Sequence, residues 1–272
     1  MITISSNTLI LNEIENIDGL IKNLIDAQID EIIFLDGGST DGSYEKLLEY
    51  EKKYSFIKAM RWKQPDNSEF KIGFRESDRR NIMKMASSSD YIFYIDADER
   101  VSTNLKKEIP DKNKSAYIIK RYHFWGKNIR VNSGDDRVWS PEYQFRVIKN
   151  LKNIEFKSKE KNGLHNRIYK NGFRVIGSFN SGVLLKNILR VINNGIIGFS
   201  GKKLETVEIY HLHYLNLEKK GKTGDLRIGD IENGKIILVE SLTGGLIHNR
   251  RREHLICCLK DEEIYNKMLK YM

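Results

Sequence analysis

Two carboxylates, two positions apart, end an apolar run: Asp96 and Asp98 follow the uncharged residues 91–95, Tyr-Ile-Phe-Tyr-Ile. This run predicts a short strand buried on both faces of a sheet, with both carboxylates able to turn toward one point beyond its end. Carboxylates about 4 Å apart repel each other by roughly 4 kcal/mol at an effective dielectric of about 20, so the pair needs a proton or a cation. Oxygen ligands of this kind suit Mg²⁺ or Mn²⁺, with positions left open for phosphate oxygens. The alternative is an acidic turn that caps the next helix, with Ser102 and Thr103 as further cap candidates.

The elements that must position these carboxylates alternate along the first hundred residues. Buried-type strands are expected near 2–11, 31–35, 56–60 and 91–95, and apolar helix faces near 17–24, 44–48 and 76–87, the last with Ile82, Met85 and Ala86 on its inner side. Strand and helix in alternation predict a doubly wound parallel sheet, whose ligands bind beyond the carboxyl ends of the strands. Asp36 ends one such strand and the Asp96/Asp98 pair ends another, which favours a ligand site over the cap interpretation.

The pattern changes after Lys114. Strands are expected at 117–119, 145–148, 207–210 and 235–239, a basic connection at 149–161, and a helix at 250–270. We therefore expect an α/β fold with a mostly parallel central sheet flanked by helices. The expected domains are residues 1–200, which bind nucleotide and catalyse, and residues 201–272, a smaller mixed extension that packs on them.

Composition narrows the class of partner. Lys and Arg number 46 against 37 Asp and Glu, a net charge of +9 that favours anionic partners such as a nucleotide, a polyanionic acceptor, an acidic membrane surface or nucleic acid. The only cysteines, Cys257 and Cys258, are adjacent, which excludes a disulfide framework. The chain shows no signal-peptide pattern, so we expect a cytoplasmic protein, with the inner face of the membrane as a further place. A nucleic-acid-binding module is the alternative class, but the basic residues are scattered and no recognition motif accompanies them.

Three motifs resemble one family. Residues 33–43, Ile-Phe-Leu-Asp-Gly-Gly-Ser-Thr-Asp-Gly-Ser, resemble the nucleotide-binding turn "DDGSTDGS" of family 2 glycosyltransferases, which have the GT-A fold. Asn12-Glu13 lies where that family has "NE" after its first strand. Arg80-Asn81, followed by residues 90–99, is similar to the family's "RN…DWVLFLDADE" block.

This resemblance implies roles at the strand ends. Asp36 would accept a hydrogen bond from uracil or another base, Asp96 would hold ribose and metal, and Asp98 would bind Mn²⁺ or Mg²⁺ at the diphosphate of a nucleotide-sugar. The competing interpretations are a turn aspartate that caps its own backbone and, for Arg80, a solvated helix-face charge. The implied nucleotide-binding residues are Asn12, Glu13, Asp36, Gly38, Arg80 and Asp96.

A second block is similar to the lipopolysaccharide-core branch of the family, which also resembles peptide S-glycosyltransferases. It comprises residues 125–127, 139–146 and 163–165. Within it, Trp125 and Trp139 are candidates for stacking on acceptor sugar rings, although core packing explains them equally well.

The family inverts the anomeric centre, which requires a base to deprotonate the acceptor hydroxyl. Glu142 matches the acidic position of the family pattern and is the favoured base, with Asp136 and the neighbouring Asp135 as alternatives. His165 matches the family's histidine, but Asn166 stands where the family has Glu, which puts catalysis by that position in doubt.

The sequence thus predicts an inverting, metal-assisted transferase that moves a sugar, from a UDP-sugar by preference, to a glycan or glycolipid acceptor. A peptide or protein acceptor is one alternative. A non-catalytic binder of nucleotide-sugars is another, raised by Asn166. His211 and His213 would share one face if this part of the chain is extended, a weak signal for metal ligation.

Overall fold

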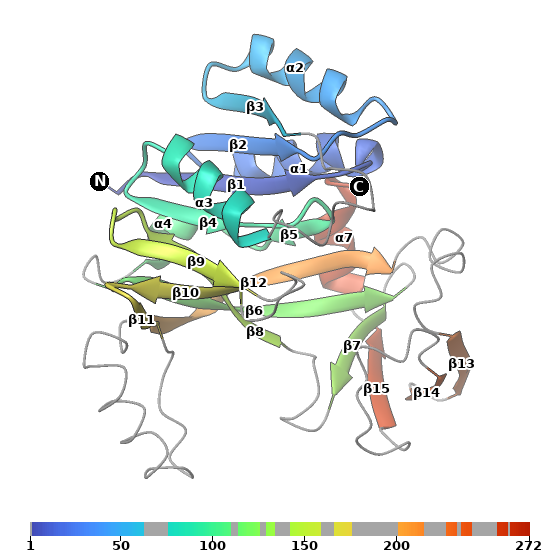
Figure 1. The fold of residues 1–272 in the computed structure, drawn as a ribbon. Helices are drawn as coiled ribbons and strands as arrows, with labels where there is room; N and C mark the ends of the chain where they lie inside the picture. The colour runs from blue at the N-terminus through green and yellow to red at the C-terminus, as the bar shows by residue number, and fades with distance from the viewer. Residues whose placement is uncertain are drawn as a thin grey trace, which may run out of the picture.

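The structure is a computed structural model (Figure 1). It describes residues 2–62, 76–109, 114–125, 129–133, 142–158, 166–175, 201–214, 227–232, 235–240, 255–260 and 262–272. The predicted site residues Asp136, Trp139 and His165 lie outside these ranges. For Trp125 and Glu142 the structure describes the backbone alone.

Four parallel strands carry the first hundred residues, in the spatial order β4-β1-β2-β3. Their bounds are Ile4–Ile10 for β1, Glu31–Asp36 for β2, Ile57–Arg61 for β3 and Tyr91–Tyr94 for β4. Between them lie helices α1 (Ile14–Asp26), α2 (Ser43–Lys53) and α3 (Glu76–Ala86). The predicted alternation of strand and helix in this part is confirmed.

Both faces of this parallel part are covered, which explains the continuous apolar runs of β2 and β4. Alternate residues of β2 enter different clusters: Ile32 and Phe34 pack in the cluster that contains the apolar face of α1, and Ile33 packs with Met83 of α3. One expectation for α3 was wrong. Met85 is 82% exposed, and Met83, two positions earlier and therefore on another side of the helix, is buried in its place.

The remaining strands extend the same sheet in a mixed pattern, in the order β13-β14-β15-β7-β6-β8-β4, with β12 paired to β5 and β6. Their bounds are β5 Glu99–Val101, β6 Ala116–Trp125, β7 Ile129–Ser133, β8 Glu142–Lys149, β12 Gly201–Tyr214, β13 Arg227–Glu232, β14 Lys235–Glu240 and β15 Leu255–Lys260. The sheet is therefore mixed, parallel at β1–β4 and between β6 and β12, and antiparallel where β8 joins β4.

A small antiparallel sheet lies beside α3. It consists of β9 (Ile154–Ser158), β10 (Asn166–Lys170) and β11 (Phe173–Arg174). The expected basic connection at 149–161 was thus wrong, because β9 alternates buried Ile154 and Phe156 with more polar neighbours.

Two short helices complete the described chain: α4 (Leu105–Glu108) and α7 (Glu262–Leu269). Asn104 caps α4, where Ser102 and Thr103 were the candidates. The single helix expected at 250–270 is instead β15 followed by α7. Within the described ranges, no helix combines the length and the apolar character needed to cross a membrane.

Candidate functional site

The loops after β1, β2 and β4 meet at one edge of the sheet. The parallel register sets Ile10 of β1 beside Asp36 of β2, and Gly37 N donates to Ile10 O at 2.8 Å. On the other side of β1, Ile95 N donates to Asn7 O at 3.3 Å, which continues the pairing to the end of β4. The carboxyl ends of these strands therefore bring together the two acidic turns, as the alternation of elements predicted.

Asp36 holds its own turn. Its side chain is fully buried, and Oδ2 accepts from Gly38 N at 2.8 Å and from Ser39 N at 3.1 Å. Arg61 of β3 adds an ion pair, with Nε 3.1 Å from the same oxygen. Gly38 lies at φ +100°, a conformation that residues with a side chain rarely adopt. The carboxylate thus has the capping contacts of an Asx turn, and the hydrogen bond from a base to Asp36 stays a prediction.

Asn12 ties the first loop to this turn. Its backbone N–H donates to Ser39 Oγ at 2.9 Å, and its side-chain Oδ1 accepts from Thr40 N at 2.8 Å. Glu13 repeats the link one residue later, where its N–H donates to Ser43 Oγ at 2.9 Å. Asn12 has φ +56°, a value that Asn tolerates better than most residues. The predicted nucleotide-binding residues Asn12, Glu13 and Gly38 therefore form one hydrogen-bonded ledge with Asp36.

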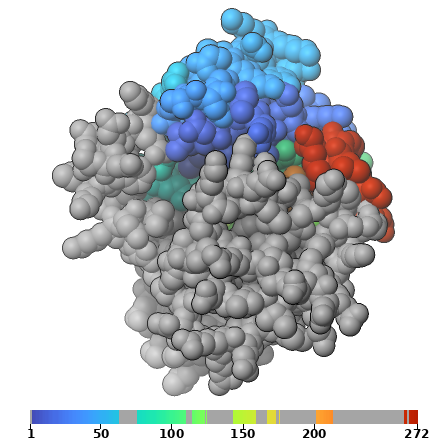
Figure 2. All heavy atoms as spheres, turned by 90° about the vertical axis from the view of Figure 1, so that its right-hand side faces the viewer, coloured from blue at the N-terminus to red at the C-terminus, as the bar shows by residue number. Residues whose placement is uncertain are grey.

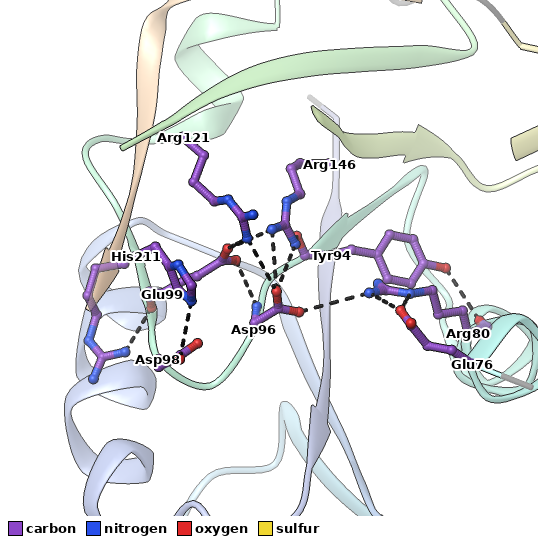
Figure 3. A network of polar contacts seen from close by, with 10 residues as sticks. Glu76, Arg80, Tyr94, Asp96, Asp98, Glu99, Arg121, Arg146 and His211 are labelled. Atoms are coloured by element: carbon purple, nitrogen blue, oxygen red, sulfur yellow. Dashed lines mark hydrogen bonds and ion pairs between the residues drawn. The ribbon is translucent and has the colours of Figure 1, made fainter. Parts of the chain in front are cut away.

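Asp96 faces three guanidinium groups (Figure 3). Arg146 Nη2 lies 3.4 Å and Arg121 Nη1 3.8 Å from Oδ2, and Arg80 Nη2 lies 3.9 Å from Oδ1. Burial works to raise the pKa of this carboxyl, but Arg146 and Arg80 outweigh it, and the neighbouring Asp98, and hold the pKa below its usual value. Asp96 is therefore an ionised carboxylate that already has cationic partners, and its side chain remains 43% exposed.

Glu99 binds two of these arginines, Arg121 and Arg146. Its side chain is fully buried, and Oε1 accepts from Arg146 Nη2 at 2.6 Å and from Arg121 Nη1 at 2.8 Å. Its Oε2 accepts from Asp96 N at 2.9 Å, which fixes the first residue of the acidic turn. We assigned no role to Glu99, Arg121 or Arg146 from the sequence. Arg146 had a signal, because it ends the Tyr-Gln-Phe-Arg run of the second block, whereas Arg121 lies in a strand with no motif.

Arg80 reaches Asp96 from α3. Its Nη2 is 2.6 Å from Glu76 Oε1 one turn earlier, and its guanidinium lies 5.1 Å from the ring centroid of Tyr94. Only 14% of the side chain is exposed, so Arg80 is not the solvated helix charge that the competing interpretation required. Its neighbour Asn81 turns to β9 instead and forms two hydrogen bonds with the backbone of Phe156.

Asp98 has a different neighbour. Its Oδ2 lies 3.3 Å from Nε2 of His211 in β12, and both side chains are largely buried, at 16% and 12% exposed. The backbone joins the same two segments, since Leu212 N donates to Asp98 O at 2.7 Å. In Figure 3 Asp98 and His211 point toward one another beside the arginine-bound Asp96. The structure thus brings His211 to the acidic turn from a strand more than a hundred residues later.

A divalent cation would find two ligands here. One carboxylate and one imidazole suit Mn²⁺, and the other positions of the ion stay available for phosphate oxygens. Asp96 is a poorer ligand, because three guanidinium groups lie within 4 Å of it. Among the described residues no three His, Cys, Asp or Glu side chains gather closely enough to form a complete metal cage. The donor set fits a metal that binds together with a phosphate ligand.

Glu142 lies close to this site in the backbone. It begins β8, and the antiparallel register sets it opposite Arg121 of β6. Trp125 ends β6, opposite Ile129 of β7. The roles predicted for these two residues, and for Asp136, Trp139 and His165, stay predictions.

Comparison with known proteins gives the family. Cholesterol galactosyltransferase of Borreliella burgdorferi is 29% identical over 106 residues, which cover 38% of this chain and only 27% of that protein. S. aureus TarS 1–349 in complex with UDP is similar at a TM-score of 0.42 and 15% identity, covering 60% of this chain and 53% of that one. A mannosyltransferase from Pyrobaculum calidifontis in complex with GDP-Man and Mn²⁺ has a TM-score of 0.36 at 14% identity, covering 44% and 36%. The model of the family described as "Glycosyl transferase family 2" matches residues 8–171. Because this match extends over more than half of the chain, the protein belongs to glycosyl transferase family 2.

Proposed function

We propose that this protein transfers a hexosyl residue from a nucleotide-sugar, with a UDP-sugar preferred, to a glycan-type acceptor with inversion at the anomeric carbon. One observation carries the proposal: the acidic turn after β4 presents Asp98 to His211 on the edge where the ledge of Asn12, Glu13 and Asp36 lies. A nucleoside diphosphate needs such a combination of a polar ledge for the nucleoside and a cation for the phosphates.

The nucleoside part of the donor is proposed to lie on the ledge. Asp36 shapes the ledge through Gly38, Ser39 and Arg61, so its contribution is to hold the turn in place. Asp96, partly exposed between its arginines, is the carboxylate that remains accessible to the ribose hydroxyls.

The diphosphate is proposed to lie beside Asp98. Arg80, Arg121 and Arg146 face Asp96, Glu99 and Glu76, so this cluster has no surplus positive charge for a dianionic leaving group. Asp98 and His211 therefore would hold Mn²⁺ or Mg²⁺, which supplies Lewis-acid charge to the departing diphosphate. The arginines keep Asp96 ionised and oriented.

The acceptor side rests on the second block. Glu142 is proposed as the base that takes the proton of the acceptor hydroxyl, with Asp136 as its alternative and His165 as an assisting group. Trp125 and Trp139 are proposed to stack on acceptor sugar rings. The likeness of this block to the lipopolysaccharide-core branch, which also resembles peptide S-glycosyltransferases, leaves both kinds of acceptor open. The galactosyltransferase relative is itself named for a lipid acceptor, which favours a glycan or glycolipid over a peptide. The net charge of +9 supports docking on an anionic membrane surface.

A donor screen tests the proposal. The purified protein is incubated with UDP-, GDP- and ADP-sugars, with Mn²⁺ or with EDTA, and release of free nucleoside diphosphate is measured. We expect release from a UDP-sugar that stops with EDTA and that falls by about two orders of magnitude or more in Asp98→Asn, which removes one anionic ligand. Asp78→Asn, an exposed carboxylate of α3, is the matched control and retains the wild-type rate.

Two outcomes would count against this proposal in different ways. Binding of UDP without release from any donor, tested with glycan acceptors, would favour the non-catalytic binder. Failure to bind any nucleoside diphosphate in the presence of Mn²⁺ would end the proposal altogether.

A further inference from the structure

A buried arginine stands directly behind the acidic turn. Arg100 is 1% exposed, and its guanidinium donates to backbone carbonyl oxygens on three segments of the chain. Nη1 donates to Ala97 O at 2.9 Å and to Glu99 O at 2.8 Å, Nη2 to Asn16 O of α1 at 3.2 Å, and Nε to Tyr271 O at 3.1 Å. Ala97 lies between Asp96 and Asp98. Arg100 therefore joins the turn that carries both carboxylates to α1 and to the segment 262–272.

The segment 262–272 is fitted to α1 at a glycine. A Cβ atom on Gly19 would lie 1.7 Å from Tyr271 O and 2.8 Å from Arg100 Nη2, so a side chain at this position would displace the carbonyl that Arg100 binds. The Tyr271 hydroxyl donates to Asp26 Oδ2 at 2.8 Å, and Lys270 Nζ lies 3.1 Å from the same oxygen. Figure 2 shows the segment, in red, against the blue N-terminal part of the molecule.

The same segment also supports the strand that carries His211. Tyr210 and Leu212, the two neighbours of His211, are buried in one cluster with Met268 and Tyr271. Both partners of the Asp98–His211 pair are thus held from behind by residues 262–272, one through Arg100 and the other through apolar packing.

The charge of Arg100 contributes to this support. Burial lowers the pKa of Arg100 to about 10, and Asp98, Glu13 and Glu99 oppose that shift. The guanidinium therefore remains charged at neutral pH, and its positive charge is felt by two of the carboxylates assigned to the donor site.

We propose that Arg100 is a positioning residue of the donor site, held in place by the backbone of residues 262–272, and that it keeps the turn 96–98 in the shape in which Asp98 faces His211. One consequence is that the segment 262–272 is required for binding of the metal and the nucleotide together, and this consequence rests on the proposed function. The claim that Arg100 and residues 262–272 hold the turn 96–98 in shape does not depend on any ligand.

Gly19→Ala tests the inference with the full chain. Alanine is the better helix former by about 1 kcal/mol, so this variant does not weaken α1 itself, whereas its Cβ displaces Tyr271 O. Hydrogen exchange is followed at the amides of Glu99 and Leu212, which donate to Asp96 O and Asp98 O. Mn²⁺ affinity in the presence of UDP is measured by electron paramagnetic resonance. Lys22→Ala, an exposed position of α1, is the matched control.

We expect exchange at these two amides to rise about tenfold or more in Gly19→Ala, with the amides of β2 unchanged, and Mn²⁺ affinity to fall by about 10- to 100-fold, as for loss of a group that orients a metal ligand. Lys22→Ala leaves both readouts at the wild-type level. Unchanged exchange and affinity in a folded Gly19→Ala would overturn the inference.

A second variant decides the matter if Gly19→Ala does not fold. Arg100→Lys keeps the charge but has a single ammonium, which cannot span the four carbonyls. Loss of Mn²⁺ affinity with an unchanged global unfolding midpoint supports the inference, and wild-type affinity refutes it. A wild-type protein that binds no Mn²⁺ with UDP would contradict the proposed function, and the exchange measurement would still decide the role of Arg100.

Discussion

The carboxylate of Glu99 is fully buried between the guanidinium groups of Arg121 and Arg146, and it also accepts from the backbone of Asp96. Glu99→Gln would replace the nearer, fully buried carboxylate beside both guanidinium groups with a neutral amide, and would leave them the more distant and more exposed carboxylate of Asp96. Breaking a buried pair in this way costs about 3–5 kcal/mol, because the remaining charges stay desolvated. We expect a loss of this size in the free energy of unfolding, measured by urea denaturation.

The control for that substitution is Glu263→Gln on α7. Glu263 pairs with Lys267, but both side chains are exposed to solvent. Solvent screens such a pair, so the unfolding midpoint should hardly move. If the two substitutions lowered the free energy of unfolding equally, the burial of Glu99 would add nothing to its contribution to stability.

The carboxyl group of Asp96 makes the free energy of unfolding depend on pH. Burial opposes ionisation, but Arg146 and Arg80 hold the folded-state pKa below the ordinary value of 3.8. A carboxyl with a depressed folded pKa stabilises the fold above its unfolded pKa, and that contribution is lost as pH falls through the folded pKa. The stability difference between wild type and Asp96→Asn should therefore be largest near neutral pH and should shrink below a pH of about 4.

Urea midpoints taken from neutral pH down to a pH of about 3 check this. Asp78→Asn, at an exposed position of α3, serves as the charge-matched control. A difference between wild type and Asp96→Asn that stays constant across the series would mean that the arginines do not hold the carboxylate ionised.

For individual residues, the sequence indicated which carboxylates lie at the carboxyl-end edge of the sheet, but it did not indicate which side chains they pair with. Asp36, Asp96 and Asp98 follow apolar runs, and a strand end is a local signal. The pairing of Asp96 with Arg121 and Arg146 depends on how β6 and β8 pair with distant segments, which no local spacing encodes. The alternation of His211 and His213 predicted a shared direction but not that Asp98 would be the neighbour.

Among the elements, α3 is hydrogen-bonded to the backbone of β9 through the side chain of Asn81. Asn81 Nδ2 donates to Phe156 O at 2.9 Å, and its Oδ1 accepts from Phe156 N at 2.8 Å, so the amide pairs with the strand as another strand would. Asn81→Asp keeps the shape but removes the donor and sets a negative charge against a carbonyl oxygen. We expect a loss of about 1–3 kcal/mol in the free energy of unfolding, the cost of a hydrogen-bonding group left unpaired.

Asn153→Asp at the turn before β9 is the matched substitution. Asn153 is exposed and bonds to the Asn171 side chain, where water can replace the lost donor. If both variants unfold at the wild-type urea concentration, the Asn81 bridge contributes nothing to the attachment of β9.

The elements themselves were predictable where burial was continuous. β2 and β4 contain continuous apolar runs and were found, as was α1 with its apolar stripe. β1 was found from the apolar residues at its ends, although the residues between them, Ser5 to Thr8, are buried and polar. β9 was missed because only Ile154 and Phe156 face the core, and its lysine, Lys157, together with the lysines on either side of the strand resembled a solvated connection. The end of β15 and the start of α7 were merged into one helix because no proline or glycine separates them.

On the scale of the whole molecule, β12 links the first 200 residues of the chain to the part that follows. The sequence placed a domain boundary at residue 200, and β12 begins at Gly201. This strand pairs with both β5 and β6 of the central sheet, and Ser102 N donates to Glu208 O at 3.0 Å. Apolar residues on both faces of the strand are buried: Leu204, Val207 and Ile209 in one cluster, and Tyr210 and Leu212 in another. The first strand of the predicted extension is therefore part of the sheet that carries the acidic turn.

Two fragments of the chain, one without β12 and one with it, measure how much β12 contributes to stability. Burial of each large apolar side chain contributes about 1.5–3 kcal/mol, so removal of β12 removes on the order of 10 kcal/mol, comparable with the whole stability of a domain. Residues 1–200 alone should therefore unfold without a cooperative transition in urea, whereas residues 1–214, which keep β12, should regain one. Circular dichroism and tyrosine fluorescence follow both fragments. A fragment 1–200 that unfolds as sharply as 1–214 would support the predicted boundary at residue 200 and would show that β12 is attached to an already complete sheet.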